Sequence, residues 1–335
     1  MHENFLFMIE SKVKKIGVLT SGGDSPGMNA AIRAVVRTSN YFQLECFGIR
    51  EGFSGLIEGD YLKMGARSVK NIISQGGTIL RSARSEEFKT PEGRKKAFET
   101  CQKIGVDGLV CIGGDGTLTG AKIFYEEYGI KVIGVPGTID NDIFGTDRTI
   151  GYDTALNTAV DALDKIRDTA TSHNRVFFVE VMGRDAGFIA LNSGIASGAV
   201  DILVPEVKDS LDELFDTFMK TEKSGKSSSI VVVAEGEKLG SIYDLAKATK
   251  EKFPQFDIRV SILGHIQRGG APSCSDRVLA SRLGFGAVYG LMEGKTNLMV
   301  GLRSDKLVYT PIEEALVKRN EMDPDLIRLA EILAI

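Results

Sequence analysis

This sequence of 335 residues contains few cysteines and prolines and no long apolar run, and its net charge is low. The four cysteines have no CxxC or metal-ligand spacing, which argues against a disulfide-built scaffold and against a cysteine-bound metal. We therefore expect Cys46, Cys101, Cys111 and Cys274 to be buried free thiols, as in a protein of the reducing cytoplasm.

Membrane-spanning and secreted proteins are also disfavoured by what the chain lacks. No stretch approaches the roughly 20 apolar residues of a membrane span. The apolar segment Phe5–Ile9 is short, lies between Glu3 and Glu10 and lacks a basic n-region, unlike a signal peptide, and Met8 suits a start as well as Met1 does. The formal net charge of −4 argues against a nucleic-acid binder. We expect neither a membrane nor a nucleic acid as a partner.

Glycine and apolar residues are abundant, with 38 glycines against 8 prolines and an apolar content of 43%. This composition suits a compact, turn-rich α/β protein, and the length favours two lobes. Short apolar runs alternate with stretches of helical spacing, such as 155–166 and 211–219. The predicted strands are 16–20, 44–49, 108–112, 131–135, 176–181, 201–204, 230–234 and 260–263, all of them buried and parallel. We predict an α/β fold of two Rossmann-like three-layer α/β/α lobes with mostly parallel sheets, divided near residue 150.

The segment Pro136–Asp142 follows a predicted strand and carries two carboxylates, Asp140 and Asp142, two residues apart. Ligands of open α/β sheets bind outside the carboxyl ends of the strands, so this loop is a candidate active site. A carboxylate pair with no intervening Lys or Arg suits proton abstraction or metal binding. The alternative is an Asx-turn, in which both side chains only satisfy their own loop.

A second loop, Gly113–Thr117, places three glycines around one acid directly after a predicted strand. Such a turn lets backbone N–H groups approach a nucleotide phosphate, and Asp115 can hold a Mg²⁺ that neutralises the phosphate charge. The alternative is a glycine-rich turn in which Asp115 only caps a helix over 118–128.

The segment 20–29 also has the form of a phosphate-binding turn, because two adjacent glycines follow the first predicted strand. Ser25 followed by Pro26 predicts the N-cap and the first residue of a helix. Arg33 and Arg37 lie four residues apart on one face of that helix. The alternative is a plain tight turn, since the segment matches neither GxxxxGK[ST] nor GxGxxG.

Cationic residues accompany several predicted strands. Met182–Arg184 and His265–Arg268 follow strands, and Arg175 and Arg259 begin the same two strands. Arginine forks suit phosphate oxygens, so these groups together predict one anionic pocket, although each alone is more often a surface cation. His265 is interpreted as a hydrogen-bonding group for a phosphate or hydroxyl, and Glu235, if buried, would need a partner such as a sugar hydroxyl.

Five segments together resemble the 6-phosphofructokinase family, and the resemblance runs from about Lys14 to beyond residue 300. They are Thr20–Arg33, Gly113–Thr117, Pro136–Asp142, Met182–Arg184 and Gly264–Gly270. The resemblance implies ATP-dependent phosphorylation of fructose 6-phosphate at its 1-hydroxyl, with Mg²⁺. It also implies a nucleotide-binding lobe of residues 1–150 plus about 265–315 and a sugar-phosphate lobe of about 151–264 plus 316–335.

The resemblance also assigns roles to residues. Asp140 is implied as the base, supported by Thr138 and Asp142, and Asp115 as the metal-binding acid; Arg84 and Arg184 complete the implied catalytic set. The implied ATP-binding residues are Gly23, Arg84, Ser85, Gly114, Asp115, Gly116 and Thr117. The implied sugar-phosphate residues are Thr138, Ile139, Asp140, Met182, Gly183, Arg184, Glu235, His265, Ile266, Gln267 and Arg268, with Arg175 and Arg259 from a neighbouring subunit of a homotetramer.

Some positions depart from the bacterial allosteric pattern of the family. Arg33, Arg37, Arg167 and Lys226 match phosphate ligands of its effector site. Ala66, Lys70, Asn71 and Val200, however, replace an arginine, a serine, an aspartate and an effector-metal acid. Near the nucleotide, Phe53 replaces a tyrosine and Ser85 an aromatic residue. We therefore expect regulation to be weak, altered or absent.

Three rival functions differ from an ATP-dependent enzyme. Pyrophosphate users of the family tend to carry Asp where Gly116 stands and Lys where Gly137 stands, so both glycines favour ATP. An NAD- or lipid-kinase-like enzyme would share the glycine loop but would not account for Met182–Arg184 and Gly264–Arg268. A non-catalytic sugar-phosphate sensor should lack one of the two acids at 115 and 140, and both are present.

Overall fold

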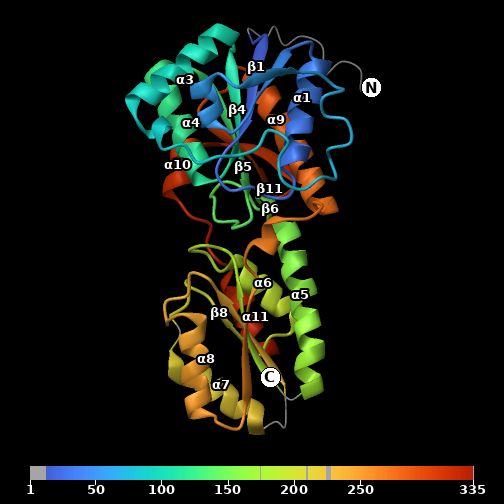
Figure 1. The fold of residues 1–335 in the computed structure, drawn as a ribbon, viewed down its shortest axis with the longest axis vertical. Coiled ribbons are helices and arrows are strands. Elements are labelled where there is room, and N and C mark those ends of the chain that lie inside the picture. The colour runs from blue at the N-terminus through green and yellow to red at the C-terminus, as the bar shows by residue number, and fades with distance from the viewer. Residues whose placement is uncertain (1–12, 174, 209, 224–227, 335) are drawn as a thin grey trace. The chain divides into compact units, whose positions relative to one another are not determined.

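Residues 13–173, 175–208, 210–223 and 228–334 are described by a computed structural model of the protein (Figure 1). The chain forms two compact units. Unit 1 comprises the residues up to Thr138 together with Ile143–Gly151 and Arg268–Asn320. Unit 2 comprises Ile139–Asp142, Tyr152–Gln267 and the residues from Glu321 onward.

Unit 1 contains, in the described part of the chain, an eight-stranded sheet of order β12-β11-β5-β4-β1-β2-β3, with β6 paired to β5. Its strands are β1 (Lys15–Thr20), β2 (Glu45–Ile49), β3 (Tyr61–Met64), β4 (Gly108–Gly113), β5 (Lys131–Thr138), β6 (Ile150–Gly151), β11 (Leu298–Arg303) and β12 (Lys306–Pro311). All pairs are parallel except β2 with β3 and β11 with β12. The predicted α/β class with a mostly parallel sheet is confirmed.

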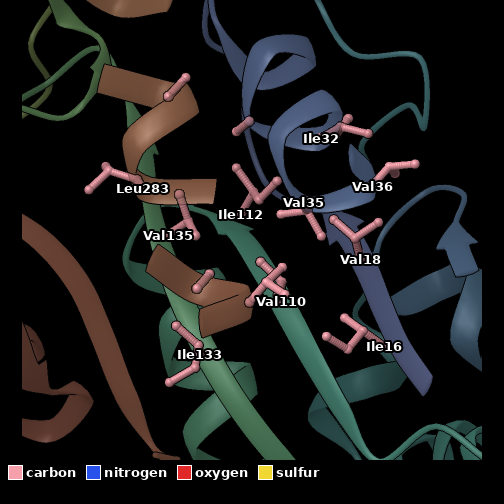
Figure 2. Packing of buried hydrophobic residues seen from close by; sticks show 14 of the residues in the cluster. Ile16, Val18, Ile32, Val35, Val36, Val110, Ile112, Ile133, Val135 and Leu283 are labelled. Carbon is pink, nitrogen blue, oxygen red and sulfur yellow. The ribbon is translucent and has the colours of Figure 1, made fainter. Parts of the chain in front are cut away.

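Helices cover both faces of this sheet because successive strand residues point to opposite sides. On one face, α1 (Met28–Tyr41) and α9 (Cys274–Met292) pack on the strands (Figure 2). Figure 2 shows this cluster, which includes Val18, Val110, Ile112, Ile133 and Val135 of the strands, Ile32, Val35 and Val36 of α1, and Leu283 of α9.

The opposite face of the unit 1 sheet is covered by a second set of helices. These are α2 (Phe53–Glu58), α3 (Pro91–Ile104), α4 (Asp115–Tyr128) and α10 (Ile312–Val317), with the 3-10 helix η1 (Glu87–Lys89) beside them. Leu19 and Leu109 of the strands pack here with Phe124 of α4, which is fully buried. The residues on the two faces alternate along each strand, so burial on both sides fixes the register of the sheet.

Unit 2 contains a parallel sheet of order β10-β7-β9-β8 among its described residues. Its strands are β7 (Arg175–Val181), β8 (Asp201–Leu203), β9 (Ser229–Ala234) and β10 (Asp257–Ile262). Helices α5 (Tyr152–His173), α6 (Phe188–Ser197) and α11 (Pro324–Leu333) contribute to the core on one face, and α7 (Leu211–Lys223) and α8 (Ile242–Lys252) to the core on the other. No described helix has both the length and the apolar character that a membrane crossing needs.

Two details of the unit 1 prediction are wrong. Helix α1 begins at Met28 with Gly27 as its N-cap, whereas Ser25 and Pro26 lie in a turn closed by a hydrogen bond from Met28 N to Ser25 O of 3.2 Å. Gly27 has φ of 109°, and a Cβ there would lie 2.7 Å from Ile150 Cγ2, so the tight approach of β6 requires glycine at the cap. Cys274 is exposed because it is the first residue of α9, while the other three cysteines are buried.

The predicted burial of the strand at 260–263 is also wrong. Strand β10 begins earlier, at Asp257, and lies at the edge of its sheet. Its residues are half-buried or exposed, and Ile262 retains 48% of its accessible surface. An edge strand has a neighbour on one side only, so it buries less of its length.

Asp201, the first residue of β8, makes the stability of unit 2 depend on pH. Burial raises the pKa of its carboxyl group to about 6, and its Oδ1 accepts a hydrogen bond of 2.9 Å from Ile202 N. Between about pH 4 and 6 the unfolded chain releases this proton first, so the fold loses stability as the pH rises.

We expect Asp201→Asn to match the wild type near pH 4 and to be more stable by about 1–2 kcal/mol near pH 7, because the amide carries no charge to bury. Urea unfolding midpoints at both pH values would measure this difference. The exposed Asp216 of α7 offers the matched control Asp216→Asn. An effect of Asp201→Asn that does not change with pH would contradict this account.

Candidate active site

Two glycine-containing loops of unit 1 lie side by side after the neighbouring parallel strands β1 and β4. Gly113 ends β4, and a Cβ there would lie 2.5 Å from Ser21 O and 2.3 Å from Thr117 Oγ1. The Thr117 hydroxyl donates a hydrogen bond of 3.0 Å to Ser21 O, which joins the two loops. Gly114 is the N-cap of α4 without a side-chain cap. The first N–H groups of α4 and its dipole are therefore available to a phosphate.

A third segment of unit 1 contacts the first of these loops. The hydroxyl of Ser21 donates to Ala83 O over 3.3 Å, and Gly22 N donates to the same oxygen over 3.5 Å. This brings Arg84, which is exposed, and Ser85 close to the glycine pair. The Ser85 hydroxyl accepts a hydrogen bond of 3.3 Å from Phe88 N.

Arg268 also lies against the loop after β1, which contains Gly23 and Asp24. Its Nη1 donates a hydrogen bond of 3.2 Å to Asp24 O, and the same nitrogen is 3.0 Å from where a Cβ on Gly23 would stand. A guanidinium at this position places positive charge beside two backbone turns that suit anions.

Asp115 is the first residue of α4, and its two carboxylate oxygens have different surroundings. Oδ2 accepts a hydrogen bond of 2.7 Å from Arg319 Nη1, while Oδ1 is buried and has no hydrogen-bond partner. No group of three or more acidic, His or Cys side chains in the described residues could hold a metal. A single carboxylate oxygen fits Mg²⁺, which takes one or two protein carboxylates and fills its other positions with waters and substrate phosphates.

The loop with the two acids follows β5. Thr138 ends this strand, and its carbonyl oxygen accepts a hydrogen bond of 2.7 Å from Thr149 Oγ1. A Cβ on Gly114 would lie 3.7 Å from Thr138 Cβ, so the end of β5 is adjacent to the glycine loop. Asp140 is buried, with 8% of its surface accessible, and Asn141 has φ of 56°.

Gly116 and Gly137 differ in the space around them. A Cβ on Gly116 would have no atom within 4 Å, whereas a Cβ on Gly137 would lie 3.2 Å from Ile112 Cγ2 and 3.3 Å from Met28 Cε. A larger residue therefore fits at Gly116 but must displace core side chains at Gly137.

In unit 2, the loops after β7 and β9 pack against each other. Arg184 has φ of 57°, and its N donates a hydrogen bond of 2.7 Å to Glu235 Oε1. A Cβ on Gly236 would lie 2.2 Å from Arg184 O. The sequence predicts a partner for Glu235 only if this residue is buried. It is exposed, so that condition is not met. Burial raises the pKa of Glu180, and the negative charge of Glu235 raises it further by a smaller amount.

The segment Gly264–Arg268 forms the 3-10 helix η2 after β10. His265 is exposed, as is Ile266, which retains 57% of its accessible surface. Gln267 is fully buried; its Nε2 donates a hydrogen bond of 3.1 Å to Gly264 O, and its Oε1 has no hydrogen-bond partner.

Arg175 and Arg259 do not join these residues within one chain. Both bind Asp257 at the first half of β7 and β10, with Arg175 Nε 2.8 Å from Asp257 Oδ2 and Arg259 Nη2 3.1 Å from Oδ1. Arg175 begins β7, whereas Arg184 follows its far end. The six steps along β7 span about 20 Å, so within one chain Arg175 lies far from Arg184, and the predicted anionic pocket does not form from these residues of a single chain. The two guanidinium groups lower the pKa of Asp257.

The proposed effector residues are spread over both units. Arg33 and Arg37 lie on α1, where burial and the charge of Arg37 lower the pKa of Arg33. Arg167 of α5 donates hydrogen bonds to Ser197 O and, over 2.9 Å, to Gly198 O. Lys226 lies outside the described residues.

The sequence interpretation missed Arg319. No local motif marks this residue, because its partner Asp115 lies 204 residues away along the chain. It is nonetheless the cation that contacts the predicted metal-binding acid.

Comparison with known proteins shows which family the chain resembles. The phosphofructokinase family model matches residues 15–291. An ATP-dependent 6-phosphofructokinase of Cytophaga hutchinsonii is 54% identical over 96% of this chain and 98% of its own length. ATP-dependent 6-phosphofructokinase 1 of Thermus thermophilus is 54% identical over 96% of this chain and 100% of its own.

Solved structures share the same architecture. The phosphofructokinase of Saccharomyces cerevisiae superposes with a TM-score of 0.87 at 39% identity, over 90% of this chain and 45% of the yeast chain. A pyrophosphate-dependent phosphofructokinase of Nitrosospira multiformis superposes with a TM-score of 0.84 at 21% identity, over 96% of this chain and 92% of its own, which shows the fold alone. This chain belongs to the phosphofructokinase family.

Proposed function

We propose that this protein transfers the γ-phosphoryl group of ATP to the 1-hydroxyl of fructose 6-phosphate, which gives fructose 1,6-bisphosphate and ADP. The observation that carries the proposal is the adjacency of the glycine loop at α4 and the end of β5, which leads into Asp140. Relatives that are 54% identical bear the name ATP-dependent 6-phosphofructokinase, which favours ATP as the donor.

The nucleotide phosphates would be bound by the loop Gly113–Thr117 and by the first N–H groups of α4. Gly23, Arg84 and Ser85 would complete this site, since their segments contact the same loops. Asp115 Oδ1 would hold Mg²⁺, and a bound Mg²⁺ neutralises charge on the phosphates. Phosphoryl transfer needs mainly alignment and charge neutralisation, and both are available here.

Asp140 would act as the general base that accepts the proton of the sugar 1-hydroxyl. Its position two residues after the end of β5 and its burial support this role, because a buried carboxylate is shielded from competing water. Thr138 and Asp142 would support it by fixing the loop, and Arg84 and Arg184 would stabilise charge on the transferred phosphoryl group.

Fructose 6-phosphate would contact Met182–Arg184, Glu235 and His265–Arg268. Arg175 and Arg259 lie in the first half of their strands, at the opposite end from Arg184, which supports a role at the site of a neighbouring subunit. We therefore include a cytoplasmic homotetramer in the proposal. Regulation through Arg33, Arg37, Arg167 and Lys226 is also a proposal; we expect it to be weak, altered or absent, because the buried Val200 cannot bind an effector metal.

The experiment that tests this function measures fructose 1,6-bisphosphate formed from fructose 6-phosphate and Mg²⁺, with ATP or pyrophosphate as the donor. We expect turnover with ATP and none above background with pyrophosphate. Turnover with pyrophosphate would contradict the interpretation of Gly116 and Gly137. Inactivity with both donors, combined with binding of fructose 6-phosphate, would favour a sugar-phosphate sensor.

A further inference from the structure

We propose that Arg319 is a positioning residue that holds the carboxylate of Asp115 in the orientation that Mg²⁺ binding requires. This inference rests on the proposed function, because it assumes that Asp115 is the metal-binding acid. The residues Lys318–Asn320, here called the strap, join two parts of unit 1 that are far apart in the sequence.

The backbone of the strap is fixed to the segment that follows the two-acid loop. Arg319 forms an isolated antiparallel bridge with Ile143, the residue directly after Asp142. The Asn320 side-chain amide donates hydrogen bonds of 2.9 Å to Ile143 O and 3.2 Å to Thr146 O. The Cα of Arg319 therefore has little freedom to move relative to this segment.

The other end of the strap continues from α10, the helix that packs on α4, which carries Asp115. Lys318 N donates a hydrogen bond of 3.0 Å to Glu314 O, so the strap continues directly from α10. Ile312 and Ala315 of α10 belong to the same buried cluster as Phe124 of α4. Figure 1 shows α10 beside α4. Helix α10 and the Ile143 bridge together hold Arg319 beside the first turn of α4.

The two oxygens of the Asp115 carboxylate differ, because only one of them binds Arg319. Arg319 Nη1 lies 2.7 Å from Oδ2, and Oδ1 is left buried without a hydrogen-bond partner. A guanidinium on one oxygen limits rotation of the carboxylate, so the second oxygen keeps one direction. Second contacts of this kind orient metal-binding carboxylates, and their loss typically costs about 10- to 100-fold in metal affinity.

Two other roles for the same contact predict different behaviour. If Arg319 acted only as a positive charge that attracts nucleotide, its loss would weaken ATP binding equally with and without Mg²⁺. If it were a cation that the metal must displace, its loss would strengthen the effect of Mg²⁺. The buried position of Oδ1 argues for positioning, because the metal then needs no atom that Arg319 occupies.

Isothermal titration calorimetry of the full-length protein with ATP, in Mg²⁺ and in EDTA, separates these roles. The measured quantity is the Kd for ATP in EDTA divided by the Kd in Mg²⁺. This ratio is the gain in ATP affinity due to Mg²⁺. We expect Arg319→Met to lower this ratio by about 10-fold and Arg319→Lys by about threefold, because lysine keeps the charge without the planar fork.

Lys318→Met is the matched control. Lys318 is exposed on the same strap, forms an ion pair of 2.6 Å with Glu314 and packs over the Phe144 ring. Its replacement by methionine therefore removes the same charge as Arg319→Met without changing a contact of Asp115. We expect its ratio to equal that of the wild type. An unchanged or increased ratio in either Arg319 variant, with melting temperatures near that of the wild type, would overturn the proposal.

Asp115→Asn distinguishes failure of this inference from failure of the proposed function. We expect the amide to abolish the gain due to Mg²⁺. If the wild type shows no gain, or if Asp115→Asn keeps it, then Asp115 does not bind the metal, and both its metal role in the proposed function and the positioning role of Arg319 are wrong. If Asp115→Asn behaves as expected and the Arg319 variants match the wild type, only the positioning role is wrong.

Discussion

Asp140→Asn is expected to lower kcat for ATP-dependent phosphorylation of fructose 6-phosphate by about 10²–10⁴, the usual contribution of a positioned general base. Asparagine has the shape of aspartate but cannot accept the proton of the sugar hydroxyl. Because Asp140 is buried, the neutral amide removes a buried charge, so the variant should fold. The KM for fructose 6-phosphate should stay within about threefold of the wild type, since the base contributes mainly in the transition state.

Asp142→Asn is the comparison for this result, because it makes the same chemical change two residues away. Asp142 is half-buried and is proposed only to support the loop, so its replacement should cost less than that of Asp140. Steady-state kinetics of both variants with saturating MgATP would measure the difference. A larger loss of kcat in Asp142→Asn would reverse the two roles, and a loss confined to KM would argue against a general base at Asp140.

The elements around the site could be predicted from the sequence where one segment contains its own signal. The glycine loop at 113–117 follows an apolar run and precedes a helical pattern, and the structure places it at the junction of β4 and α4. The start of α1 could not be predicted in this way. Ser25–Pro26 is a good helix start by itself, but the close approach of Ile150 requires glycine at position 27.

The edge position of β10 had a signal that the sequence interpretation did not use. Residues 257–262 read Asp-Ile-Arg-Val-Ser-Ile, and this alternation of polar and apolar residues is typical of a half-exposed strand. Arg319 had no such signal. Its role depends on Ile143 and Asp115, which are distant in the sequence and are brought together only by the packing of α10 on α4.

Gly116→Asp is expected to lower ATP-dependent turnover by about 10²-fold or more without destabilising the fold. Gly116 is the second residue of α4, and a side chain there would meet no atom within 4 Å of its Cβ. An acid in the first turn of a helix interacts favourably with the helix dipole, so the melting temperature should be unchanged or slightly higher. The same carboxylate would face the proposed phosphate site. Two unit charges about 5 Å apart at an effective dielectric constant of about 20 repel by about 3 kcal/mol, which corresponds to about 10²-fold in rate.

Gly116→Asn separates charge from size in this experiment, because its side chain fills the same space without a negative charge. We expect it to retain most of the ATP turnover that Gly116→Asp loses, with both measured as kcat/KM for MgATP. Gly137→Lys is a poorer test of charge, since a side chain there would push on Ile112 and Met28 and change the local packing as well. If Gly116→Asp turned over ATP as fast as the wild type, the nucleotide phosphates could not lie at the start of α4. If Gly116→Asp lost activity only because it unfolded, the conclusion that position 116 has room for a side chain would be wrong.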